Sequence, residues 1–194
     1  MSQHLWWYTA RAGGLVAWAL VVASCTWGLL LGVRAHVLGV RTNTAWTLSL
    51  HRWLGALAVV FTAVHVLAIL ADGFVDFGLV DVLVPFTTSW HSVAVAWGIV
   101  GMYLLVAIEI TSLLRARLRP RHWRTIHLLS YVLLGITTIH LLTAGTDSTT
   151  VVPEALAVVV GMVAVFGCSL LLVWRSAPRT RQVFAERPDA ASAR

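Results

Sequence analysis

Four histidines stand inside two long apolar segments, and their spacing is nearly the same in both. His51 and His65 are fourteen residues apart in one segment, and His127 and His140 are thirteen apart in the other. An imidazole in a membrane-length apolar helix is costly and needs a partner, so four of them indicate a function rather than packing. At 1.5 Å per residue, each pair spans about 20 Å of a hydrocarbon core that is about 30 Å thick.

These histidines could bind metal at two levels of a membrane. Two helices lying side by side would offer one imidazole each at both levels. The metal that suits two facing neutral imidazoles, with no thiolate or carboxylate nearby, is haem iron in the core of a helical bundle. The pattern therefore predicts a b-type cytochrome whose iron ligands are His51, His65, His127 and His140.

The composition requires a membrane around these segments. The chain is 59% hydrophobic and 11% charged, and a soluble domain of 194 residues could not bury so many apolar side chains. We predict an all-α integral membrane bundle over residues 1–174, followed by a disordered cytoplasmic tail over 175–194. Its five predicted transmembrane helices cover about 12–33, 47–71, 92–114, 125–144 and 153–174.

The arginines predict the orientation of the chain in the cell membrane. All fourteen basic residues are arginines, and all but Arg11 gather after the first, third and fifth spans, whereas the loops over 72–91 and 145–152 contain none. By the positive-inside rule the C-terminus is cytoplasmic and the N-terminus is outside. The second and fourth spans then run in the same direction, so depth alone pairs His51 with His127 at the inner level and His65 with His140 at the outer level. The net charge of +6 reports this orientation and not nucleic-acid binding.

Several other polar residues have candidate roles near these levels. Arg52 and Arg124 stand where an inner haem would present its carboxylates, which guanidinium groups bind well. Glu109 could pair with an arginine or carry a proton, and we favour the ion pair because the side chain can reach the interface. The remaining histidines lie at or beyond the span ends, and we expect them to form ordinary hydrogen bonds: His4, His36, His91 and His122.

The aromatic residues and cysteines have simpler expected roles. We predict interfacial anchors at the span ends: Trp6, Trp7, Tyr8, Trp46, Trp90, Trp123 and Trp174. Residues 73–85 form a short amphipathic pattern that could cap the outer haem. Cys25 and Cys168 fall inside spans and are expected to be buried small residues. Val22–Cys25 resembles a lipoprotein cleavage box, but the apolar run continues past it, so we expect no cleavage.

The thirteen-residue spacing raises a geometric question about the fourth span. On an ideal helix, fourteen residues return to within about 40° of the starting face, whereas thirteen leave the second side chain about 140° away. The span must either tighten locally, for example near Gly135, Thr137 and Thr138, or hold its two haems on different flanks.

The segments around the histidines resemble a known family. The run Leu50–Gly55 with His65, the segment Val82–Phe86, the stretch Glu109–Leu114, and Arg121–Tyr131 with His140 and Ala144–Asp147 are similar to the ferric reductase-like transmembrane domain. That superfamily includes the membrane parts of NADPH oxidases and ferric reductases, and the haem subunit of bacterial methionine sulfoxide reductase systems. The resemblance covers about residues 45–147 and implies two stacked b-type haems, held by His51 with His127 and by His65 with His140.

The resemblance also implies a function, with alternatives that the sequence leaves open. We expect single electrons to pass from a cytoplasmic flavoprotein, or from membrane quinol, to an acceptor outside such as ferric iron or a partner oxidoreductase. FAD or FMN would come only through that partner, because no dinucleotide-binding fingerprint is present in this sequence. The alternatives are a quinol-linked haem anchor of an extracytoplasmic oxidoreductase, and a haem-free transporter or scaffold whose histidines line a proton or metal path.

Overall fold

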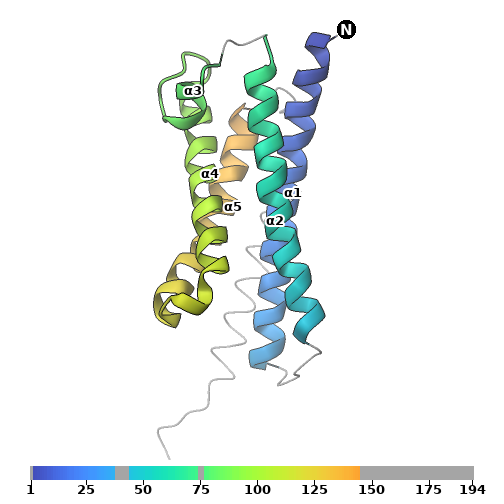
Figure 1. The fold of residues 1–194 in the computed structure, drawn as a ribbon, viewed down its shortest axis with the longest axis vertical. Coiled ribbons are helices and arrows are strands. Elements are labelled where there is room, and N and C mark those ends of the chain that lie inside the picture. The colour runs from blue at the N-terminus through green and yellow to red at the C-terminus, as the bar shows by residue number, and fades with distance from the viewer. Residues whose placement is uncertain (1, 38–43, 74–76, 145–194) are drawn as a thin grey trace, which may run out of the picture.

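Membrane-length helices dominate the computed structural model, which describes residues 2–37, 44–73 and 77–144. Four helices in these ranges are long and apolar enough to cross a membrane. They are α1 (Ser2–Val37), α2 (Thr44–Ala71), α4 (Ser92–Leu113) and α5 (Pro120–Ala144) (Figure 1). Two short elements lie between them, α3 (Leu79–Leu83) and the 3-10 turn η1 (Arg115–Arg117). The chain is therefore a helical, multi-pass membrane protein, and the four long helices coincide in sequence with the first four predicted spans.

Parts of the sequence-based prediction lie outside the described residues. These are the fifth span at 153–174, the tail at 175–194, Cys168, Trp174, and the side chains of His4 and His36. The structure can therefore be compared with the predictions only for the first four spans and the segments that join them.

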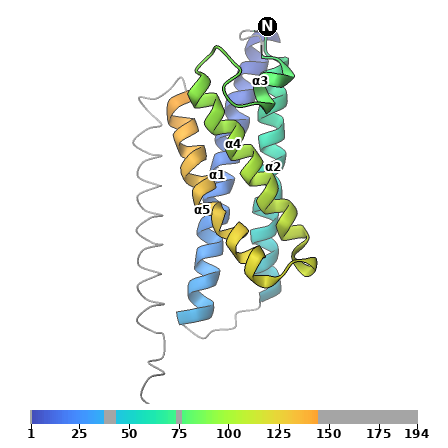
Figure 2. The same cartoon turned by 90° about the vertical axis from the view of Figure 1, so that its left-hand side faces the viewer.

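The helices form two antiparallel hairpins. α1 packs along α2, and α4 packs along α5, whereas contacts between the two hairpins are far fewer. Figures 1 and 2 show the hairpins side by side, with α3 at the end of the bundle where the chain starts. Successive helices alternate in direction, so α2 and α5 run the same way, as the arginine pattern predicted.

The helix ends extend beyond the predicted spans because hydropathy marks only the apolar part of a helix. α5 begins at Pro120, five positions before the predicted start at 125. Proline suits the first turn of a helix, where its missing N–H has no intrahelical acceptor and its fixed φ is already helical. α1 likewise runs past both ends of its apolar stretch, which covers Leu5–Gly32.

The continuity of α5 argues against the local tightening considered for the thirteen-residue spacing of His127 and His140. This helix is α-helical from Pro120 to Ala144, so the local tightening near Gly135 is not observed. The hydroxyls of Thr137 and Thr138 instead donate to carbonyl oxygens three or four residues earlier, at 2.7–3.2 Å. Such bonds leave the helix intact and often bend it.

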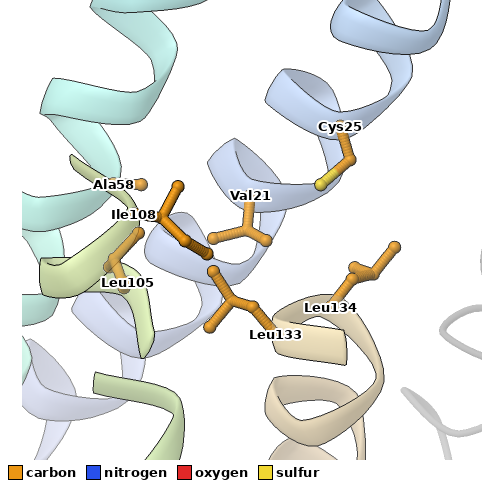
Figure 3. Close-up of a cluster of buried hydrophobic side chains, with 7 residues drawn as sticks. All are labelled: Val21, Cys25, Ala58, Leu105, Ile108, Leu133 and Leu134. Carbon is orange, nitrogen blue, oxygen red and sulfur yellow. The ribbon is translucent and has the colours of Figure 1, made fainter. Parts of the chain in front are cut away.

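A layer of buried apolar side chains joins all four long helices (Figure 3). Its members on α2 and α5 lie between the two histidines of the same helix in sequence, and its other members come from α1 and α4. We call it the central apolar layer, and it consists of Val21, Cys25, Ala58, Leu105, Ile108, Leu133 and Leu134. The predicted burial of Cys25 is confirmed, and the two histidine levels lie on opposite sides of this layer.

Candidate functional site

The structure brings the four histidines together as two pairs, one at each level. The upper pair, His65 with His140, lies toward the end of the bundle that carries α3, and its ring centroids are 6.3 Å apart with planes at 76°. The lower pair, His51 with His127, lies toward η1, with centroids 5.8 Å apart and planes at 80°. Each pair joins α2 to α5 across the space between the hairpins, and these are the pairs that depth alone predicted.

Backbone carbonyls fix the orientation of the upper pair. The Nδ1–H of His65 donates to the carbonyl oxygen of Ala10 on α1 at 2.6 Å, and that of His140 donates to the carbonyl oxygen of Ala94 on α4 at 2.8 Å. A carbonyl oxygen can only accept, so the proton of each neutral ring is on Nδ1. The lone pair of Nε2 is then free to bind a metal, which is the usual arrangement of metal-binding histidines.

Serine hydroxyls occupy the same position at the lower pair. Ser24 Oγ on α1 lies 3.3 Å from His51 Nδ1, and Ser112 Oγ on α4 lies 3.4 Å from His127 Nδ1. A hydroxyl can donate or accept, and these separations are longer than those at the upper pair. The lower rings are therefore oriented by weaker bonds to side chains.

Glycines make room for three of the imidazoles. A Cβ added at Gly98 would lie 2.7 Å from His140 Cε1, and one at Gly14 would lie 2.9 Å from His65 Nδ1. A Cβ at Gly28 would lie 3.0 Å from His51 Cε1. These glycines stand on α1 and α4, one turn after Ala10, Ala94 and Ser24. α1 and α4 therefore supply both the space and the hydrogen-bond partners for rings carried by α2 and α5.

This arrangement gives a sequence signal that the histidine spacing alone did not reveal. The four-residue step from a hydrogen-bond partner to a glycine occurs at Ala10–Gly14, Ser24–Gly28 and Ala94–Gly98. Residues four apart lie on one helix face, so each step puts a partner and a gap next to the same ring. The two hairpins thus repeat one local design.

A cavity of about 330 Å³ lies beside the upper pair. Both upper histidines line it, and Val21, Leu105 and Leu133 of the central apolar layer contribute to its wall. Phe77 and Val82 from the segment around α3 also line it, as expected for a cap. The volume lies within the range of small-molecule and cofactor sites, which is about 300–1,000 Å³.

Two charged residues also line this cavity, and the sequence reasoning assigned a role to neither. Arg11 lies over the ring of Trp7, with its guanidinium carbon 4.9 Å from the ring centroid. Asp72 follows α2, and its Oδ1 is buried without a hydrogen-bond partner among the residues that the structure describes. The cavity is otherwise mainly apolar, with tryptophans in its wall at Trp7, Trp18 and Trp90.

At the lower end, an aromatic stack covers one of the histidines. The ring of Trp123 stacks on that of His127, with centroids 5.1 Å apart and planes at 20°. The guanidinium carbon of Arg115 lies 4.4 Å from the centroid of the Trp123 ring. Trp123 is thus a neighbour of the candidate ligand rather than only an interfacial anchor. The spacing of four residues between Trp123 and His127 on one helix was a signal for this contact.

The other predicted anchors divide into two groups. Trp6, Tyr8 and Trp46 are exposed, as lipid-facing anchors should be. Trp7 and Trp90 line the upper cavity instead, and the Trp90 ring lies edge-on to those of Phe77 and His91. The tryptophans near the ends of the helices therefore serve the interior of the protein as well as its lipid surface.

The remaining predicted polar residues are placed as follows. The side chains of Arg52 and Arg124 are exposed and form no recorded ion pair in the described ranges, so their role stays a prediction. Glu109 packs against the backbone of Gly55. No ion pair of Glu109 is found among the residues that the structure describes, so the ion pair stays a prediction. His91 is exposed and precedes α4 with a φ of 42°, and His122 is exposed.

No group of three or more metal-binding side chains of His, Cys, Asp or Glu occurs within residues 2–37, 44–73 and 77–144. Each pair of imidazoles thus stands as a two-ligand group. This suits a cofactor that brings its own equatorial ligands, whereas a bare metal ion usually requires three or four protein ligands.

Comparison with known proteins gives one match. A family model described as the ferric reductase like transmembrane component matches residues 12–138, which is well over half of the chain. The matched stretch contains His51, His65 and His127, and it ends two residues before His140. Neither the curated proteins nor the solved structures contain a match. The chain belongs to the ferric reductase like transmembrane component family.

Proposed function

We propose that this protein is a transmembrane b-type cytochrome that relays single electrons between the two faces of the membrane. The observation that carries the proposal is the arrangement of the four imidazoles as two facing pairs, one above the other. In each pair, the Nδ1 atoms lie near hydrogen-bond partners on the neighbouring helices. His51 with His127 and His65 with His140 would hold two haems. Family membership supports the same function.

The distances fit a haem iron between the rings of each pair. A bond from an imidazole nitrogen to a metal is about 2 Å long, so two rings on opposite sides of one metal have centroids about 6 Å apart. The observed separations are 6.3 Å and 5.8 Å. The Nδ1 hydrogen bonds leave Nε2 of the upper rings available for the metal, and the upper cavity offers a mainly apolar space beside them.

Haem supplies a reversible one-electron change at iron. The chain contributes the positions of the two groups and the medium between them. Two imidazoles would hold each haem iron, which would leave no open site there for oxygen or substrate and favours relay over catalysis at the metal. The central apolar layer separates the two levels with mainly apolar side chains.

The direction of transfer follows from the membrane potential. Moving one elementary charge through the whole potential changes the free energy by about 2.3 kcal/mol per 100 mV. With an inside-negative potential, the outward movement of an electron is favoured. We place the lower pair near the cytoplasm because the arginine-rich loops lie at that end of the spans. A separate flavoprotein or membrane quinol would supply electrons there, and the outside acceptor would take them near the upper pair.

Electron transfer across a sealed membrane tests this function. Liposomes that contain the purified, haem-loaded protein and enclose ferricyanide are mixed with a membrane-impermeant reductant. The wild type should reduce the enclosed ferricyanide, and His65→Ala and His127→Ala should each lower the rate to that of protein-free liposomes. His91→Ala, which changes an exposed histidine outside both pairs, serves as the control and should retain the wild-type rate.

A wild-type rate equal to that of protein-free liposomes would contradict the proposal, and so would full activity in both pair variants. The donor is identified in the same preparation by adding either a flavin reductase or a quinol analogue. We expect the flavin reductase, and not the quinol analogue, to reduce the haems.

A further inference from the structure

The stack of Arg115, Trp123 and His127 has a polar group that no neighbour satisfies. Nε1 of Trp123 is buried and has no hydrogen-bond partner among the described residues. The indole N–H is a donor only, and buried donors in folded proteins nearly always have an acceptor. Because the same ring stacks on the candidate ligand His127, the missing acceptor belongs beside the lower pair.

The position of this N–H argues against a purely interfacial role for Trp123. A tryptophan that anchors a helix at the membrane surface directs its N–H toward water or lipid headgroups. Here the N–H is shielded from solvent by the protein itself. The Trp123 ring contacts both a guanidinium group and an imidazole, with the Arg115 guanidinium carbon 4.4 Å and the His127 ring centroid 5.1 Å from its centroid.

Arg115 adds the matching charge. Its guanidinium group lies over the Trp123 ring, in a favourable cation–π position, and its side chain starts from η1, directly before α5. A guanidinium group binds carboxylates through two parallel hydrogen bonds. A buried N–H and a guanidinium group placed together beside a haem ligand form a carboxylate-binding site.

We propose that Trp123 and Arg115 bind a propionate carboxylate of the haem held by the lower pair. This inference rests on the proposed function, and it goes beyond it by assigning a carboxylate site that differs from the one predicted at Arg52 and Arg124. The side chains of those two arginines are exposed and make no recorded contact with the lower rings. Trp123 and Arg115 thus fix the orientation of the haem and neutralise one of its charges.

Midpoint potentials of the individual haems test this assignment. His65→Ala should leave only the lower haem and His127→Ala only the upper one, so that each haem can be titrated alone by spectroelectrochemistry. Trp123→Phe keeps an aromatic ring against His127 and removes the N–H, and Arg115→Gln removes the charge. Either change leaves the carboxylate less neutralised, which stabilises ferric over ferrous iron. The midpoint potential of the lower haem should therefore fall, while that of the upper haem stays unchanged.

Arg117→Gln is the matched control, because it removes the same charge from the same turn without a recorded contact to Trp123. It should leave both potentials at the wild-type values. The inference is overturned if Arg115→Gln and Trp123→Phe leave the lower potential where Arg117→Gln leaves it, or if they shift both haems equally. It is also overturned if Arg52→Gln or Arg124→Gln lowers the potential and Arg115→Gln does not. A wild type that binds no haem contradicts the proposed function itself, which separates the two failures.

Discussion

The imidazoles of the two levels differ in the groups that hold them. The upper rings donate to main-chain carbonyls of Ala10 and Ala94, which no side-chain substitution removes. The lower rings lie next to the hydroxyls of Ser24 and Ser112, which a single substitution deletes. Partners of this kind orient metal-binding histidines and increase their basicity. Side-chain substitutions should therefore affect the orientation of the imidazole rings most directly at the lower pair.

Ser24→Ala and Ser112→Ala should each raise the midpoint potential of one haem only. Without an acceptor for the Nδ1–H, the imidazole donates less electron density, and ferric iron is stabilised less. The direction is opposite to that expected for Arg115→Gln. Loss of such a partner typically weakens metal binding by about 10–100-fold, so the affinity for that haem should also fall.

Redox titration and haem release in detergent measure these two effects. Thr26→Ala and Thr111→Ala are suitable controls, because these hydroxyls donate to carbonyls within their own helices. Potentials in the serine variants that match those of the threonine controls would show that the serines do not orient the rings.

Gly98→Ala should displace His140 and lose one haem. The added Cβ would lie 2.7 Å from Cε1 and 2.9 Å from Nδ1 of that ring, and it would press on the hydrogen bond to Ala94. Haem content after purification, measured against protein, reports the loss. Gly135→Ala is the matched control, since nothing lies within 4 Å of a Cβ there.

In the control, replacing glycine by alanine in a helix should stabilise the protein by about 0.5–1 kcal/mol, with full haem content. Equal haem content in the two glycine variants would contradict the role of Gly98.

At this scale the sequence predicted the histidines but not their surroundings. An imidazole inside an apolar span is conspicuous because its residue type is unusual there. The hydrogen bonds to the carbonyls of Ala10 and Ala94 could not be predicted from residue type, since every residue has a backbone carbonyl. Trp123 was interpreted as an anchor because its type and position suit the interface, and only the fold shows the ring against His127.

Within each hairpin, the two helices contribute different residues to the histidine sites. α2 and α5 carry the histidines, and α1 and α4 carry the glycines and hydrogen-bond partners. Hydropathy predicted the four described spans, because a membrane requires about 20 apolar residues per helix. Their ends differ from the prediction where polar residues continue the helix, as at Pro120. The short helix α3 was expected only as an amphipathic segment over 73–85.

Leu134 belongs to the central apolar layer but does not line the upper cavity, so it should contribute stability without taking part in haem binding. Leu134 on α5 is only 6% exposed, whereas Leu128 on the same helix is 59% exposed. Leu134→Ala should therefore destabilise the protein by about 2–5 kcal/mol through the cavity it creates, while Leu128→Ala should have a small effect.

Thermal unfolding in detergent, followed beside haem content, compares the two leucine variants. Both should retain the wild-type number of haems at low temperature. Similar unfolding temperatures for the two variants would argue against this layer as the packed centre of the bundle.

At the scale of the whole molecule, the described helices form two hairpins, and the contacts between the hairpins are fewer than the contacts within each. This leaves room between them at the upper level, where the cavity is found, and it brings the rings of α2 and α5 together at both levels. The parallel direction of α2 and α5 was predictable because arginine-rich loops alternate with loops that lack arginine. The relative placement of the hairpins was not, since it depends on packing between residues far apart in the sequence.

The haem-to-protein ratio of the wild type and of single histidine variants tests the central claim most directly. The account predicts two haems per chain in the wild type, and one in each of His51→Ala, His65→Ala, His127→Ala and His140→Ala. Variants of one pair should lose the same haem, as identified by its midpoint potential, and variants of the other pair should lose the other haem. His122→Ala should keep both. A well-folded wild type without a b-type spectrum, or variants of a pair that retain two haems, would contradict the account.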